Sequence, residues 1–163
     1  MQQPEIRQLD PFPVAYFRRY GRDSDSGDLP GAAQQAWNAF HAFAVPRGLV
    51  REGAEMLGVC QSDPMTTPPA DIAYDACIAD VGRRLTGHDE PQAGMIEGGR
   101  YAVFTYRGGY DGLGDAWHRV HSELLPASGH TPRHAPAFEW YRVFPAMAAN
   151  PEDWVTELWV PVQ

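Results

Sequence analysis

The sequence predicts an α+β domain built from two βαββ repeats related by a pseudo-twofold axis. Three observations carry this prediction: a length of 163 residues, a segment that recurs at a near-constant offset, and alternating strand-like and helix-like patterns in each copy. The length suits one domain with a sizeable core, so we expect a single domain over residues 1–163. The internal repeats are expected at about 6–81 and 98–163.

Two matched segments define the repeat. Residues 14–21, VAYFRRYG, reappear at 101–108 as YAVFTYRG, an offset of 87, and the segment around Trp37 returns around Trp117, an offset of 80. The polar loop 22–28 has no equivalent in the second copy and absorbs the change in offset. Several matches in the same order are unusual by chance, so the chain contains one module twice.

The first copy contains three strand-like runs and one helix-like run. Runs rich in Val, Tyr, Phe and Cys predict strands near 12–20, 54–61 and 72–81. Apolar residues at helical spacing predict a helix near 30–45, which ends before Pro46.

The second copy repeats this order. Strands are predicted near 100–107, 137–144 and 154–162, and a helix near 111–125 that ends before Pro126.

Six strands and two helices favour an antiparallel sheet with both helices on one face. A groove between the helices is then a natural ligand site. The stretch 82–98, rich in Gly and charge, links the repeats and is long enough for one extra short element.

The charge balance excludes several classes of function. The thirteen basic residues are all Arg, against 21 acidic residues, which gives a net charge of −8. An acidic domain lacks the positive surface that phosphate backbones need, so no direct nucleic-acid partner is expected. Without Lys the chain has neither a Walker-type phosphate loop nor a Schiff-base nucleophile.

The N-terminus is polar, and no apolar stretch is long enough to span a bilayer, so we expect no signal peptide and no membrane partner. Cys60 and Cys77 make no metal-ligand spacing and fit a reducing interior; a bridge between paired strands is the less favoured alternative to two buried thiols. The predicted location is cytoplasmic.

Several short segments stand out by their order and spacing: VAY at 14–16, CQSDP at 60–64, YDAC at 74–77, GGRYAVF at 98–104, RGGY at 107–110, FEWY at 138–141 and ELWVPV at 157–162. In this order and spacing they resemble the GyrI-like family of small-molecule-binding proteins, which includes the effector-binding domains of bacterial AraC-type and MerR-type multidrug regulators. The resemblance extends from about Ile6 to the end of the chain.

The resemblance implies two βαββ repeats and a pocket for amphipathic, often cationic, aromatic compounds. In the family a Glu on the middle strand of the second half faces the ligand, and Glu139 matches it; Tyr110 matches a tyrosine that lines the pocket. No helix-turn-helix segment fits before residue 6, so the chain looks like a stand-alone member. Some stand-alone members are thought to hydrolyse strained cyclopropane-bearing genotoxins, and others inhibit a topoisomerase.

The repeat singles out Glu139 independently of the family. At an offset of 81 its counterpart is Gly58, so the carboxylate exists in one copy only. Strand alternation places Glu139, Tyr141 and Val143 on one face, and burial of that face among aromatic rings would suit a bound cation. A solvent-facing Glu on an edge strand is the alternative. The predicted ligand-binding set is Glu139, Tyr110, Tyr141, Trp37, Trp117 and Trp159; core packing is the alternative role of each Trp.

No metal and no cofactor are predicted. Four histidines cluster in the second half, but no Cys or HExxH pattern accompanies them: His118, His121, His130 and His134. The Gly-rich segment 107–114 lacks the Lys that follows a phosphate loop, and a turn with a positive φ at glycine explains it without a ligand.

Three hypotheses of function follow. The first is a stand-alone sensing or sequestration module that binds small aromatic, amphipathic or cationic molecules. The second is a hydrolase of strained electrophiles, in which Glu139 acts as acid or base and Tyr141 donates a hydrogen bond. The third is binding of a protein partner, as a topoisomerase inhibitor does. We expect a monomer or weak dimer. The ligand, a DNA-binding partner protein and a lid role for residues 22–29 stay open.

Overall fold

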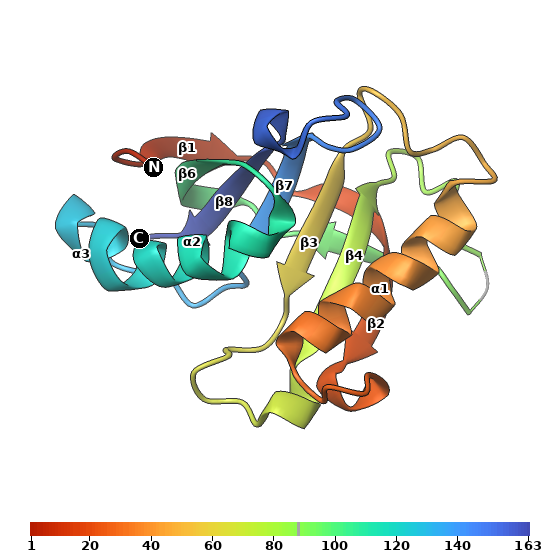
Figure 1. Cartoon of the computed structure of the whole chain (residues 1–163), viewed down its shortest axis with the longest axis horizontal. Helices are drawn as coiled ribbons and strands as arrows, with labels where there is room; N and C mark the ends of the chain where they lie inside the picture. The colour runs from red at the N-terminus through yellow and green to blue at the C-terminus, as the bar shows by residue number, and fades with distance from the viewer. Residues whose placement is uncertain (88) are drawn as a thin grey trace. The chain divides into compact units, whose positions relative to one another are not determined.

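The computed structural model describes residues 1–87 and 89–163 (Figure 1). The chain divides into two compact units. Unit 1 comprises Met1–Asp10 and Glu97–Gln163, and unit 2 comprises Pro11–Ile96. The α+β class is confirmed in both units, each an antiparallel sheet with helical cover. The groove expected between the two helices, and a single domain over the whole chain, stay predictions.

Unit 2 contains a four-stranded sheet and one long helix. The strand order is β3 (Met56–Cys60), β4 (Ala73–Ala79), β2 (Phe12–Tyr20) and β5 (Gln92–Ile96), and every pairing is antiparallel. The helix α1 (Leu29–Ala44) lies across this sheet and contacts β4 and β2 (Figure 1).

Local capping sets the start and end of α1. The side chain of Asp28 accepts a hydrogen bond from the backbone N–H of Gly31, which satisfies one of the unpaired donors at a helix start. Ser26 donates a hydrogen bond to the same carboxylate, so residues 22–29 include the N-terminal cap of α1. The helix ends at Ala44, as Pro46 predicts.

Unit 1 also contains a four-stranded antiparallel sheet. The order is β1 (Glu5–Leu9), β6 (Gly99–Arg107), β8 (Val155–Pro161) and β7 (Phe138–Val143). Its core lies between the sheet and the helical segment that follows β6. The buried members of that core are Ala102, Phe104, Ala116, Val120, Leu125, Leu158, Val160 and Val162.

The helical segment of unit 1 extends beyond its predicted end. It comprises α2 (Leu113–Arg119), a π-helical turn (Val120–Leu124) and α3 (Leu125–Ser128), so the prediction that Pro126 ends it was wrong. The wider π turn interrupts the regular hydrogen-bond pattern just before the proline. Pro126 therefore lies in the first turn of a new helical segment, where its missing N–H is not needed. The segment ends at Gly129, which has a left-handed φ of 76°.

Each sheet has one short strand beyond the predicted set, β1 in unit 1 and β5 in unit 2. β1 belongs to the first repeat but pairs with β6 of the second, and β5 precedes the second repeat but pairs with β2 of the first. Their bounds differ by the same offset of 87 that relates β2 to β6. Each repeat thus begins with a strand that completes the other repeat's sheet. β5 is the extra element for which 82–98 had room, and the expected repeat bounds omit it.

The two cysteines are free thiols. They lie on the paired strands β3 and β4 but on opposite faces of the sheet, since Cys60 is opposite Tyr74 and Cys77 is opposite Leu57. Burial raises the pKa of the Cys77 thiol well above its ordinary value.

Over the described ranges 1–87 and 89–163, no helix combines the length and the apolar character that a bilayer crossing requires. The cytoplasmic location stays a prediction.

Candidate functional site

Glu139 lies on the face of the unit 1 sheet that α2 covers, because it is opposite Leu158 of the buried core. Its carboxylate is half-buried and accepts two hydrogen bonds. Trp117 Nε1 donates to Oε2 at 3.0 Å, and the hydroxyl of Tyr141 donates to Oε1 at 2.8 Å. Both donors are neutral, so these bonds order the carboxylate without adding a positive charge. Three of the predicted ligand-binding residues therefore meet.

Tyr110 is the fourth predicted residue near this group. It begins a short 3-10 turn (Tyr110–Gly112), and its ring lies 5.7 Å from the ring of Tyr141 and 4.9 Å from that of Trp154. The side chain is 38% exposed. Partial burial, together with the negative charge of Glu139, raises the pKa of Tyr110 to about 12. Tyr110 therefore offers a neutral hydroxyl and an aromatic face within the electrostatic field of Glu139.

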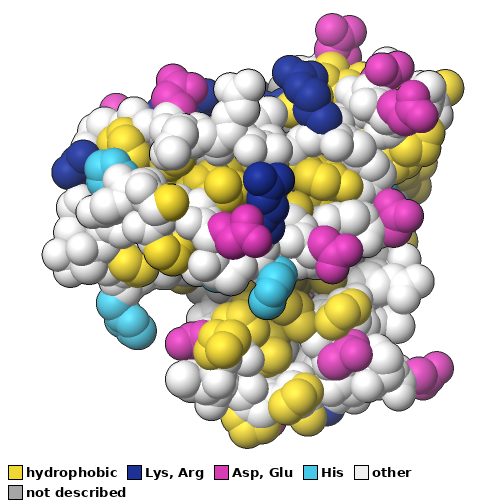
Figure 2. All heavy atoms as spheres, turned by 60° about the vertical axis from the view of Figure 1, so that its left-hand side comes forward, with side chains coloured by type: hydrophobic (Ala, Val, Ile, Leu, Met, Phe, Trp, Pro, Cys, Tyr) yellow, Lys and Arg dark blue, Asp and Glu magenta, His cyan; other side chains and the backbone are white. Residues whose placement is uncertain are grey.

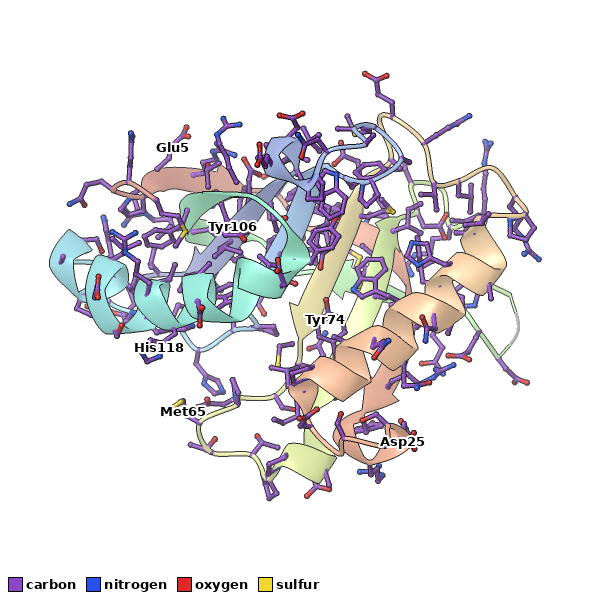
Figure 3. The ribbon with its side chains drawn as sticks, viewed as in Figure 1. Glu5, Asp25, Met65, Tyr74, Tyr106 and His118 are labelled. Carbon is purple, nitrogen blue, oxygen red and sulfur yellow. The ribbon has the colours of Figure 1, made fainter. Side chains whose placement is uncertain are left out.

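Glycines shape the turn that carries Tyr110. Gly108 has a φ of 136°, which confirms the positive φ predicted for a glycine here. A Cβ on Gly112 would overlap the hydroxyl of Tyr106, and that hydroxyl donates a hydrogen bond to the carbonyl of Gly109 at 2.7 Å. Tyr106 lies beside the segment that leads into α2 (Figure 3). Tyr106 thus stabilises the turn through a hydrogen bond to its backbone, and the turn itself contains Tyr110.

Trp154 is an aromatic neighbour that the predicted set omits. It directly precedes β8, and its Nε1 donates a hydrogen bond to the carbonyl of Ala148 at 2.9 Å, which fixes the ring beside Tyr110. A strand over 154–162 was predicted, and alternation along it places Trp154 on the same face as Leu158. That alternation was the signal that could have identified it.

Trp117 also stacks on a histidine. Its ring lies 5.6 Å from that of His121, with 17° between the planes. His121 belongs to the π turn and is exposed. One edge of Trp117 is therefore hydrogen-bonded to Glu139, and one face is covered by an imidazole.

Trp159 lies apart from this group. Neighbouring Leu158 faces α2, so Trp159 faces the other side of the sheet, where it stacks on Phe138 at 5.5 Å. Its Nε1 donates a hydrogen bond to Glu157 at 3.1 Å, and only 3% of the residue is exposed. The structure does not bring Trp159 together with Glu139, because the strand register, not the residue type, decides its face.

Trp37 belongs to unit 2. Its Nε1 lies 3.0 Å from the hydroxyl oxygen of Tyr74, which accepts the hydrogen bond, and its ring packs edge-on against Phe40 at 5.1 Å. Tyr74 projects from β4 toward α1 (Figure 3). A ligand contact by Trp37 stays a prediction.

A hollow of about 160 Å³ opens on the face of the unit 2 sheet away from α1. One of its lining residues is Asp75, which is 1% exposed. Arg18 donates to both carboxylate oxygens of Asp75, at 2.7 and 2.8 Å, and Gln61 donates to one of them at 2.9 Å. Arg18 thus compensates the charge of this carboxylate.

In the described part of the chain, no three or more His, Cys, Asp or Glu side chains gather as metal ligands would. His118 and His121 are both exposed, and Figure 2 shows histidine side chains as separate spots on the visible surface.

Known proteins share this sequence pattern and this fold. The family model of the GyrI-like small molecule binding domain matches residues 2–163. A DNA gyrase inhibitor of Yersinia enterocolitica is 27% identical over 118 residues, which cover 69% of this chain and 70% of the inhibitor.

Two solved structures have a similar fold. SAV2435, in a structure bound to tetraphenylphosphonium, has a TM-score of 0.68 and 18% identity; the match covers 99% of this chain and 94% of that one. A hydrolase encoded by lin2189 of Listeria innocua has a TM-score of 0.57 and 14% identity, over 99% and 92% of the two chains. With the family model matching nearly every residue, the chain belongs to the GyrI-like small molecule binding domain family.

Proposed function

We propose that unit 1 binds an aromatic or amphipathic cation, with Glu139 as the charged contact. The observation that carries this proposal is the half-buried carboxylate of Glu139, held by two neutral donors, Trp117 and Tyr141, among aromatic rings. Tyr110 and Trp154 extend the aromatic surface on the side of Tyr141. The protein would act as a sensing or sequestration module.

The physical argument favours a cation that carries aromatic groups. A carboxylate partly removed from water interacts more strongly with an opposite charge than an exposed one does. Each Trp or Tyr face adds about 0.5–2 kcal/mol of attraction for a cation, and burial of an apolar body adds to this. The hydrogen bonds from Trp117 and Tyr141 order the carboxylate before a cation binds.

The family supports a small-molecule ligand, and SAV2435 supplies the probe. The structure of SAV2435, which is similar in fold, contains tetraphenylphosphonium, a cation with four phenyl rings. That compound combines a positive charge, opposite to that of the Glu139 carboxylate, with aromatic rings that can pack against those of unit 1.

The test compares tetraphenylphosphonium with the neutral compound triphenylphosphine oxide, followed by quenching of tryptophan fluorescence. We expect saturable binding of the cation and, for Glu139→Gln, a roughly tenfold or greater loss of affinity, because the amide keeps hydrogen-bonding atoms but not the charge. The neutral compound should bind both proteins equally. Glu123→Gln, which removes an exposed carboxylate from the same unit, is the matched control and should bind the cation normally. Equal cation affinity in the wild type and Glu139→Gln would overturn the role of Glu139.

Hydrolysis of a strained electrophile is a second candidate, favoured by the direct hydrogen bond between Tyr141 and Glu139. Glu139 would take a proton from water while the water oxygen attacks a cyclopropane carbon. The ring C–C bond would break toward an adjacent carbonyl of the substrate, and Tyr141 would donate a proton to the resulting enolate. Both Glu139→Gln and Tyr141→Phe should then abolish turnover of a cyclopropyl ketone electrophile. A wild-type protein that binds but does not convert such compounds would exclude this reaction.

Binding of a protein partner is the third candidate, because one relative is a DNA gyrase inhibitor. The net charge of −8 would suit a surface that competes with nucleic acid. A gyrase supercoiling assay tests it. Inhibition that persists in Glu139→Gln would support a surface separate from Glu139, and no inhibition by the wild type would exclude gyrase as the partner.

A further inference from the structure

A buried hydroxyl without a hydrogen-bond partner lies close to the proposed site. Thr156 in β8 is 0% exposed. Leaving aside residue 88, which is not described, its Oγ1 is the buried side-chain oxygen or nitrogen that makes no hydrogen bond. Such atoms are rare in native proteins, because a buried polar group that loses water without gaining a partner costs free energy. The position therefore requires a physical explanation.

The strand register places Thr156 on the same face as Glu139. Thr156 is opposite Tyr141 of β7 and Tyr106 of β6, and two residues further along β8 Leu158 is opposite Glu139. The two flanking tyrosines do not donate to Thr156. The hydroxyl of Tyr141 donates to Glu139, and that of Tyr106 donates to a backbone carbonyl.

One turn covers both tyrosines that flank Thr156. The ring of Tyr110 contacts Tyr141, and Tyr106 packs beneath the glycines of the turn 108–112. Tyr110 is 38% exposed, although the side chains beneath it are buried or half-buried. Because Thr156 is 0% exposed, a bound molecule could reach its hydroxyl only if a side chain or segment that covers it moved.

In unit 2 the side chain at the position equivalent to Thr156 has a structural role. The register equivalent of Thr156 is Tyr74, which is opposite Cys60 of β3 and Arg19 of β2. The hydroxyl of Tyr74 accepts the hydrogen bond of Trp37, the counterpart of Trp117. In unit 1 the tryptophan of the helix, Trp117, donates its hydrogen bond to Glu139, so Thr156 is not needed as an acceptor.

We propose that the hydroxyl of Thr156 hydrogen-bonds a neutral polar group of the bound molecule. The inference rests on the proposed function and narrows its ligand class: aromatic cations that also carry a hydroxyl, carbonyl or amide group. A single hydroxyl can donate one hydrogen bond and accept others, but it cannot neutralise a charge. Thr156 therefore selects for a neutral group beyond the charge that Glu139 recognises.

The test uses two variants and two kinds of probe. Thr156→Val removes the hydroxyl at nearly constant shape, and Thr156→Ser keeps it. The probes are tetraphenylphosphonium, which cannot form hydrogen bonds, and its derivatives with a hydroxymethyl group at position 3 or 4 of one ring. We expect the wild type and Thr156→Ser to bind one hydroxymethyl isomer about fivefold to tenfold more tightly than the parent, the range of one hydrogen bond. Thr156→Val should lose this preference and bind the parent compound as the wild type does.

Stability supplies a second readout. Since Thr156→Val removes an unpaired buried hydroxyl, its melting temperature without ligand should equal or exceed that of the wild type. A lower melting temperature, or an unchanged preference for the hydroxymethyl isomers in Thr156→Val, would overturn the proposal. If the parent cation binds and weakens in Glu139→Gln while Thr156→Val changes nothing, only the role of Thr156 fails. If the wild type binds none of the probes, the proposed function fails with it.

Discussion

The two units place different side chains at the same point under their helices. Gly58 of unit 2 and Glu139 of unit 1 occupy equivalent positions in their sheets, opposite Ala76 and Leu158. In unit 2 the helix tryptophan, Trp37, donates to a tyrosine hydroxyl; in unit 1 the helix tryptophan donates to Glu139. The fold therefore needs an acceptor for this tryptophan but does not need a carboxylate. Glu139 is therefore an addition to the architecture that the two units share.

The faces of the two sheets that point away from the helices resemble each other. Each buries a carboxylate there, Asp75 in unit 2 and Glu157 in unit 1, and each carboxylate accepts a hydrogen bond from an arginine at 2.7 Å. Arg18 serves Asp75, and Arg142 serves Glu157. Both units thus pair the buried acid on this face of the sheet with an arginine. Glu139, on the other face of its sheet, accepts hydrogen bonds from Trp117 and Tyr141.

The largest expected effect comes from giving unit 2 the carboxylate of unit 1. Gly58→Glu would bury a charge beneath α1, where Trp37 already donates to Tyr74, and should destabilise the protein by about 3 kcal/mol or more. Urea unfolding followed by tryptophan fluorescence measures this. Gly58→Ala is the control for the added Cβ. Adding Tyr74→Phe should recover part of the loss, because Trp37 can then donate to the new carboxylate. A Gly58→Glu protein as stable as Gly58→Ala would refute the contrast between the units.

A smaller effect is expected from removing the acceptor in unit 2. Tyr74→Phe deletes the hydroxyl that accepts from Trp37 and should cost about 1–2 kcal/mol of unfolding free energy. Glu139→Gln keeps an acceptor for Trp117 and should change stability by less than about 0.5 kcal/mol. Urea titrations of both variants under identical conditions test this order, and a reversed order would show that Glu139 has a structural role.

The smallest effect is expected on the pKa of Tyr110, which the charge of Glu139 helps to raise. Tyr110 has a pKa raised to about 12, from an ordinary value of about 10. Since the neutral phenol is favoured in the folded state, its contribution to stability is complete below about pH 10 and is lost as the pH rises through about 12. Phenolate absorbance, with Tyr110→Phe subtracted, measures this ionisation. Glu139→Gln should shift it to lower pH, and an unchanged midpoint would mean that the charge does not reach Tyr110.

Strand alternation was enough to predict that Glu139 and Tyr141, at the centre of the candidate site, share one face of the sheet. It placed Glu139 and Tyr141 on one face, and both lie on the face that α2 covers. The same rule fails beyond Tyr141, because the register shifts between Tyr141 and Val143. A bulge inserts a residue without leaving a recognisable signal in a short strand.

The rest of the site depended on information between strands. The pairing of β8 with β6 and β7 determines that Trp159 and Glu139 lie on opposite faces of the sheet. The residue pattern of one strand does not reveal how that strand pairs with its neighbours. The hydroxyl of Thr156 is unpaired only because two tyrosines on neighbouring strands donate elsewhere. β1 and β5 escaped prediction because they are short and partly exposed, although the offset of 87 between them was present in the sequence.

The pairing of β1 and β5 with strands of the other repeat also affects the order in which the sheets can form during synthesis. As the chain leaves the ribosome, β2 emerges long before β5, so one edge of its sheet stays open until residue 96 has been made. β1 is synthesised well before β6, and it pairs only after β6 has appeared in the second repeat. Neither repeat can finish folding alone, and a gene divided at the repeat boundary would encode two fragments that each carry a strand the other requires.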